Sequence, residues 1–174
     1  MVSQALCQKG KEVINMLDQL KELLDMQRVL DDAILKEHGK VYDETIAEQN
    51  EIALFVELGE MMNELEPLFK HWKKKPKYNR EKALVEYVDA LHFALSLFNH
   101  YGYPIKTMGH TYKIKIKEYS IDLEDILNCV RNNASNNLTG LFILGNKLGF
   151  TWEEIYNAYK AKNAVNYERL RNGY

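Results

Sequence analysis

The sequence predicts an all-α fold, a helical bundle, on three observations. Apolar side chains recur at steps of three and four residues in several long segments, which is the period of an α-helix. Gly39, Pro67, Gly102 and Pro104 lie between those segments, where they end helices. The 174 residues are 46% hydrophobic and contain no repeat or low-complexity linker, so we expect a single domain over residues 1–174 with one core.

Three long helices are expected in the N-terminal part of the chain, over residues 11–37, 43–66 and 80–101. In the first, apolar residues such as Leu17 and Leu24 repeat at helical steps before Gly39 ends the pattern. Pro67 discourages continuation of the second helix, and Gly102 ends the third. Short helix-breaking connections therefore separate the three.

The C-terminal part of the chain begins with a different pattern. Residues 105–119 include the alternating stretch YKIKIKEY, which indicates extended chain, and we treat this segment as an excursion from the bundle. A helix should open at Asp122, and another should lie at about residues 138–148. Thr151 can cap a last helix, because Glu154 three residues later completes a capping box.

Composition and charge narrow the class of protein. The formal net charge is −2, from 23 Lys and Arg against 25 Asp and Glu, so we expect neither a nucleic acid nor a membrane as partner. Cys7 and Cys129 form no CxxC motif, which argues against a zinc site or a disulfide framework and favours the reducing cytosol. No apolar run reaches the roughly 20 residues that span a bilayer, and no signal peptide is evident. We therefore expect a cytoplasmic protein.

The third expected helix carries a narrow polar stripe. Most of its side chains from residue 83 to 98 are apolar, and the polar ones at steps of three or four are Glu86, Asp89, His92 and Ser96. A helix that is apolar on most faces belongs inside a bundle, where carboxylates need a partner or a metal. The alternative is a solvent-facing stripe, because acids at helical spacing are common on surfaces.

A second acidic pair favours the metal interpretation. Glu57 and Glu60 lie in the apolar segment ELGEMMNEL of the second expected helix, with the same spacing of three. In an antiparallel hairpin that turns at about residue 73, Glu57 faces Asp89 and Glu60 faces Glu86. Four carboxylates this close repel one another, and a hard divalent cation relieves that repulsion. Mg²⁺ fits best and implies a polyphosphate ligand, because it keeps positions for water and phosphate oxygens.

Other metal chemistries fit less well. A di-iron bundle needs a Glu-x-x-His motif from each of two helices, and here only Asp89 and His92 approach that pattern. His92 is then a buried structural residue, or one that holds a metal-ligand carboxylate, rather than a ligand itself. The sequence contains no HExxH, GxxxxGK[ST], GxSxG or GxGxxG motif, which argues against zinc proteases, P-loop enzymes, serine hydrolases and Rossmann oxidoreductases.

These segments together resemble a known superfamily. ELGEMMNEL, FKHWKKKP and EYVDALHF are similar to the ExxE and ExxD signature of the all-α nucleoside triphosphate pyrophosphohydrolases, which include MazG-type enzymes and dimeric dUTPases. KNAVNYERLRNGY resembles the phage and Gram-positive branch of the dimeric dUTPases. The resemblance implies a homodimeric bundle that hydrolyses dUTP to dUMP and pyrophosphate with Mg²⁺. It implies that Glu57, Glu60, Glu86 and Asp89 bind the metal, and that Glu60 or Glu57 activates the attacking water.

The resemblance also implies substrate-binding residues. Gln27 and Trp72 would contact the base, although the asparagine expected shortly after Gln27 is absent. The C-terminal KxxxNxxR element and the final tyrosine would hold the triphosphate and sugar, through Lys162, Asn166, Arg169 and Tyr174. Two alternatives stay open: a related pyrophosphohydrolase that acts on another nucleotide such as dCTP, and a non-enzymatic helical interaction protein.

A basic loop separates the two acidic helices. Its cations are Lys70, Lys73, Lys74, Lys75, Lys77 and Arg80. One interpretation is an electropositive entrance that attracts a triphosphate, and the other is a solvated surface. Binding of nucleic acid would need a broader basic surface than the net charge indicates.

Overall fold

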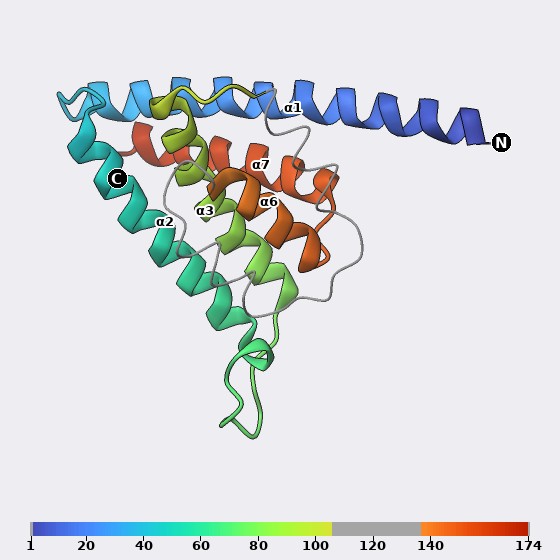
Figure 1. Ribbon diagram of the computed structural model, residues 1–174. Helices are drawn as coiled ribbons and strands as arrows, with labels where there is room; N and C mark the ends of the chain where they lie inside the picture. Colours follow the sequence, from blue (N-terminus) through green and yellow to red (C-terminus); the bar gives the residue numbers. More distant parts are fainter. Residues whose placement is uncertain (1, 106–136, 174) are drawn as a thin grey trace.

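The computed structural model describes residues 2–105 and 137–173, with side chains described over residues 16–105 and 138–173. The described residues form five α-helices and one short 3₁₀-helix (Figure 1). The elements are α1 (Val2–Glu37), α2 (Glu44–Glu64), η1 (Glu66–Leu68), α3 (Arg80–Tyr101), α6 (Asn137–Lys147) and α7 (Trp152–Arg171). The expected all-α class is confirmed. No described helix has the length and apolar character needed to cross a bilayer.

Local capping explains where these helices begin and end. The Asp43 carboxylate accepts a hydrogen bond of 2.9 Å from the backbone N–H of Ile46 at the start of α2. Asn79 caps α3 in the same way, and Gly102 ends α3 at a φ of 66°, which favours glycine. The expected capping box of Thr151 and Glu154 opens α7. Helix ends near these residues were therefore predictable from the sequence.

Two expectations differ from the structure or lie outside it. The first helix was expected from residue 11, but α1 begins at Val2 and continues through Gly10. A single glycine costs a helix only about 1 kcal/mol, so it does not force an end there. The expected helix at Asp122 lies outside the described residues, as does nearly all of the extended stretch over residues 105–119.

Helix α3 is the centre of the bundle. It is buried on most of its surface, and α1, α2, α6 and α7 all pack against it (Figure 1). Helices α2 and α3 form an antiparallel hairpin, whose connection protrudes at one end of the molecule. Helix α1 crosses the other end, and its N-terminal part extends beyond the other described helices. The stripe of α3 that the sequence singled out therefore lies where α1, α2 and α7 approach it.

Helices α1 and α7 run side by side in the same direction (Figure 1). The indole nitrogen of Trp152 donates a 2.7 Å hydrogen bond to Gln19 at the beginning of this contact. Further along, the hydroxyl of Tyr159 donates to Oε1 of Gln27 at 2.8 Å. The contact brings the second half of α7 against the part of α1 that contains Gln27, and both lie next to α3.

Candidate active site

The four acidic residues predicted to bind metal lie together on α2 and α3. Carboxylate oxygens of Glu57, Glu60 and Glu86 lie within 4.8 Å of one another, one from each side chain. Asp89 is close enough that its charge raises the pKa of both Glu57 and Glu86. We call these four residues the acidic quartet. The antiparallel hairpin brings the two pairs together, because residues three apart share one face of each helix.

The electrostatics of the acidic quartet are those of crowded like charges. Burial raises the pKa of Glu57 to about 7, and the charges of Asp89, Glu60 and Glu86 add to the effect. The pKa of Glu86 is raised by burial first and then by Asp89 and Glu60. The donor set is all oxygen, and the negative charge is in excess. Such a set fits a hard divalent cation such as Mg²⁺ or Ca²⁺ rather than a softer metal.

Lys162 reaches the acidic quartet from α7. Its ammonium group donates a 2.6 Å hydrogen bond to Oδ2 of Asp89. Its charge also lowers the pKa of Glu57 and of Glu86. The sequence indicated Lys162 as a contact for phosphate, and the structure places it where a phosphate held near the acidic quartet would be within reach.

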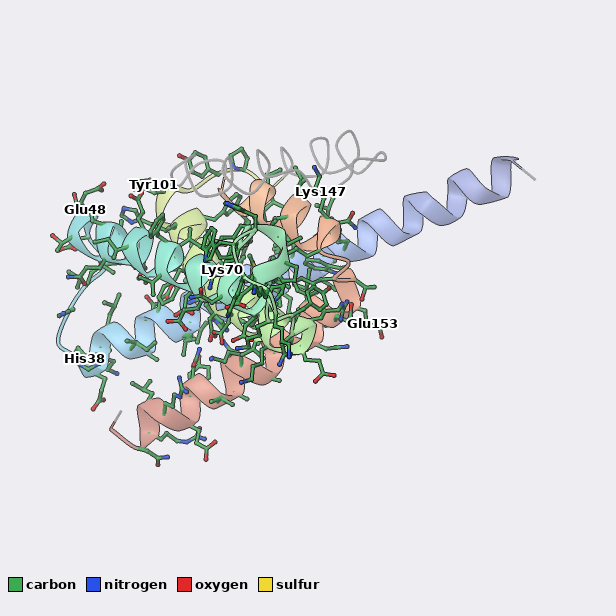
Figure 2. The ribbon with its side chains drawn as sticks, turned by 90° about the horizontal axis from the view of Figure 1, so that it is seen from below. His38, Glu48, Lys70, Tyr101, Lys147 and Glu153 are labelled. Atoms are coloured by element: carbon green, nitrogen blue, oxygen red, sulfur yellow. The ribbon has the colours of Figure 1, made fainter. Side chains whose placement is uncertain are left out.

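A cavity of about 420 Å³ lies next to this region, between α1, α2, α3 and α7. Its lining includes three of the predicted substrate-binding residues: Gln27, Asn166 and Arg169. Apolar side chains such as Leu30, Ile34 and Phe93 line it as well. His38, which follows the C-terminal end of α1 and is labelled in Figure 2, also lines it. A cavity that combines apolar walls with polar side chains is suited to a small molecule.

Gln27 is buried and takes part in a hydrogen-bonded network inside this cavity. Its Oε1 lies 2.7 Å from Nδ1 of His92 and 2.8 Å from the hydroxyl of Tyr159. Its Nε2 donates to Oδ1 of Asp31 at 2.7 Å. The ring of His92 stacks on that of Tyr159, with centroids 4.2 Å apart. Burial, with a contribution from Lys162, lowers the pKa of His92 to about 3, so the imidazole is neutral at physiological pH.

Asp31 continues the network toward α2 and α3. Ser96 on α3 donates a 2.6 Å hydrogen bond to Oδ2 of Asp31. Asn50 on α2 donates to Ser96 at 3.0 Å and to the hydroxyl of Tyr42 at 2.7 Å. Asp31 was not among the residues that the sequence predicted to be functional. A signal was present, because Asp31 follows Gln27 by four residues, as Ser96 follows His92, so each pair shares a helix face.

Two other predicted contacts are not placed in the cavity. Trp72 lies on the connection between α2 and α3 with 66% of its surface exposed, where its ring meets Phe69 and His71 edge-on. It is not among the residues that line the cavity. Tyr174 lies outside the described residues.

Most cations of the basic loop are paired with carboxylates. The buried Glu66 accepts hydrogen bonds from Lys73 at 2.6 Å and from Lys70 at 3.0 Å. Lys77 pairs with Glu64 and Arg80 with Glu154. Lys70 lies at the loop end of the hairpin, seen end-on in Figure 2. These four cations therefore hold the loop and the bundle together, and only Lys74 and Lys75 of the cluster show no ion pair among the described residues.

The chain was compared with models of known protein families and with curated proteins. A family model described as dUTPase matches residues 19–174 of the chain, which include the acidic quartet, Gln27 and the last helix. No curated protein matches the chain.

Proposed function

The chain belongs to the dUTPase family, and we propose that its hydrolysis of dUTP to dUMP and pyrophosphate depends on magnesium held by the acidic quartet. The family match identifies a dUTP diphosphatase, a hydrolase that acts on phosphoanhydride bonds and needs a divalent metal. The convergence of Glu57, Glu60 and Glu86 oxygens within 4.8 Å is the observation that supports the metal site most directly.

The residues of the acidic quartet suit magnesium chemistry. Mg²⁺ binds through one or two carboxylates and takes water and phosphate oxygens for its other ligands. When bound, it supplies positive charge that stabilises a reacting phosphate and acidifies water. Glu60 is the exposed member of the quartet, so its carboxylate can accept a proton from the attacking water. Glu57, the other predicted acid of α2, is the alternative base.

Helix α7 is proposed to hold the triphosphate. Lys162, Asn166 and Arg169 lie at i, i+4 and i+7 and so share one helix face. That face begins at Asp89 with Lys162 and continues into the cavity with Asn166 and Arg169. It therefore connects the metal site to the cavity, as a nucleoside triphosphate bound across both would require.

The cavity is proposed to hold the base. Gln27 and His92 both line it, and both belong to the hydrogen-bonded network that includes Asp31. A uracil ring offers a carbonyl oxygen next to an N–H, which can pair with such neighbouring groups. Trp72 stays a prediction from the family resemblance, because its side chain is exposed on the α2–α3 connection and does not line the cavity in this structure.

Magnesium and substrate are tested together. We expect the chain to release dUMP and pyrophosphate from dUTP in Mg²⁺, and to release neither once a chelator removes the metal, because the quartet alone repels a triphosphate. The measurement is product release from dUTP, dCTP and the other canonical nucleotides. Faster release from dCTP would support the related pyrophosphohydrolase. No hydrolysis of any nucleotide in Mg²⁺ would support the non-enzymatic alternative.

A homodimer is proposed from an apolar face of α2 that no other described helix covers. Ile52, Phe55 and Val56 are 67%, 59% and 47% exposed and lie within about one turn of helix. Apolar residues grouped on a surface mark an interface, and each such side chain contributes about 1.5–3 kcal/mol when fully buried. Helix α2 therefore has apolar side chains outside the face that it packs into the core, which a second copy of the protein could cover.

Ile52→Glu should therefore convert the dimer into a monomer, because a charge would be buried in the interface. Light scattering should report 20.4 kDa for this variant and twice that mass for the wild type. Val165→Glu is the matched control, because Val165 is also exposed but lies on α7. A wild-type protein of 20.4 kDa at micromolar concentration would contradict the proposal, as would an Ile52→Glu variant that stays dimeric.

A further inference from the structure

Asp31 stands at one end of a chain of hydrogen bonds that ends at His92. Nε2 of Gln27 donates to Asp31 at 2.7 Å, and Oε1 of Gln27 lies 2.7 Å from Nδ1 of His92. Tyr159 also donates to the same Oε1 at 2.8 Å. The chain connects α1, α3 and α7 at the wall of the cavity, and its members are buried or partly buried.

Most residues in this series of hydrogen bonds do not determine which partner donates and which accepts. A primary amide carries both a donor and an acceptor, a neutral imidazole can place its proton on either nitrogen, and a hydroxyl can donate or accept. Gln27, His92 and Tyr159 could therefore all be reversed together without losing a hydrogen bond. An ionised carboxylate is different, because it can only accept. Asp31 is the member that excludes the reversed arrangement.

We propose that Asp31 is the positioning residue that gives the cavity its preference for uracil, by fixing the Gln27 amide and through it the tautomer of His92. With the amide nitrogen directed to Asp31, Oε1 must face His92, so Nδ1 of His92 carries the proton. Nε2 of His92 is then an acceptor. The inference rests on the proposed use of this cavity for the base.

The state of His92 supports this assignment. Its side chain is 5% exposed, and within the described residues its Nε2 has no hydrogen-bond partner. A buried polar atom without a partner costs free energy unless a ligand satisfies it. The neutral ring has one proton to place, and the stacked Tyr159 ring holds the imidazole in one orientation. Because His92 lines the cavity, this buried acceptor belongs to the cavity wall, where the N–H of a bound base would satisfy it.

Uracil and cytosine differ in the hydrogen-bond donors and acceptors that they would present to this wall of the cavity. Uracil presents a carbonyl oxygen and an N3–H, which complement the second N–H of the Gln27 amide and the lone pair on Nε2 of His92. Cytosine presents an amino group and an unprotonated N3 at the same positions. Its amino group would then face the N–H of Gln27, and its N3 would face the lone pair of His92, so neither hydrogen bond could form. Reversing the amide and the tautomer would reverse this preference.

Asp31 is itself held in place from two helices and the α1–α2 connection. Ser96 donates to its second oxygen at 2.6 Å, and Asn50 links Ser96 to Tyr42. Burial raises the pKa of Asp31 to about 6, against hydrogen bonds from Ser96 and Gln27 that lower it. At pH 8 the carboxylate is therefore ionised, and the comparison of variants belongs at that pH.

The test compares Asp31→Asn with Asp32→Asn at pH 8 in Mg²⁺. The amide introduced by Asp31→Asn can donate as well as accept, so both directions of the chain become available. The ratio of kcat/KM for dUTP to that for dCTP should then fall at least about ten-fold. Asp32 is the matched control, because it is adjacent and exposed, and the ratio should be unchanged there. An equal loss for both nucleotides in Asp31→Asn would overturn the proposal.

The tautomer gives a readout that does not depend on activity. Nitrogen NMR of the wild-type protein should show the proton of His92 on Nδ1, and Asp31→Asn should show a mixture or the reverse. A wild-type proton on Nε2 would overturn the proposal even if no variant folds. Failure of the proposed function is distinguishable from this outcome, because it appears as a wild-type protein with the Nδ1 proton that does not prefer dUTP.

Discussion

Glu60→Gln should lower kcat for dUTP at least about 100-fold in saturating Mg²⁺. Glutamine keeps the shape of the side chain but removes a negative charge that the metal and the attacking water both need. Replacing a residue that only supports a metal ligand typically lowers metal affinity or activity about 10- to 100-fold. Replacing a residue that is both ligand and base should therefore have a larger effect. Asp89→Asn should be similarly inactive. Steady-state release of dUMP measures both.

A matched control distinguishes the loss of a metal ligand from the loss of any negative charge on α2. Glu48, labelled in Figure 2, is an exposed acid on the same helix, nine residues before Glu57 and so about 13 Å from it along the axis. Glu48→Gln should keep wild-type activity. Circular dichroism should show an unchanged helical signal in every variant. Full activity of Glu60→Gln or Asp89→Asn would exclude these residues as metal ligands.

The thermal stability of the metal-free protein provides a second test of the repulsion among the carboxylates of the acidic quartet. The pKa of Glu57 is about 7 in the folded protein, against an ordinary value of 4.5, so the folded state binds the proton more tightly. The carboxylate therefore destabilises the fold increasingly as pH rises from about 4.5 to 7, and the loss remains above pH 7. Without metal, Glu57→Gln should raise Tm at pH 8 more than at pH 5.

The acidic quartet could be predicted because both of its constraints are local. The spacing of three on each helix places two acids on one face, and Pro67 with the loop after it fixes the turn of an antiparallel hairpin. These two facts place Glu57 and Glu60 opposite Glu86 and Asp89, and the structure brings their oxygens together. The limits of α3 were equally local, because Asn79 and Gly102 are a capping residue and a glycine in left-handed conformation.

Features that depend on packing between distant segments could not be predicted. Asp31 meets Ser96, and Gln27 meets Tyr159, only because α1 lies against both α3 and α7. The basic loop illustrates the same limit, since the sequence showed a row of lysines but not that the buried Glu66 pairs with Lys70 and Lys73. Charge alone suggested an entrance for a triphosphate, whereas the contacts describe a loop held closed on itself.

Arg169→Ala should lower kcat/KM for dUTP roughly 10- to 150-fold, which corresponds to the 1.5–3 kcal/mol of a charge-assisted hydrogen bond. Arg169 lines the cavity, and Lys162, about two turns earlier, touches the acidic quartet. At 1.5 Å per residue the two positions lie about 10 Å apart along α7, a distance that an extended triphosphate can bridge. A guanidinium also gives paired donors to phosphate, which lysine does not.

The control for Arg169 is its neighbour Arg171, which is exposed on the last turn of α7 and does not line the cavity. Arg171→Ala should leave kcat/KM within about two-fold of wild type, because an isolated surface charge contributes little. Binding of Mg²⁺ to Arg169→Ala, measured by calorimetry, should match wild type, since the acidic quartet is intact. Truncation before Lys162 should be more severe, because it removes every cation that α7 is proposed to offer the triphosphate. A truncated protein that hydrolyses dUTP at the full-length rate would show that this half of α7 only supports the fold.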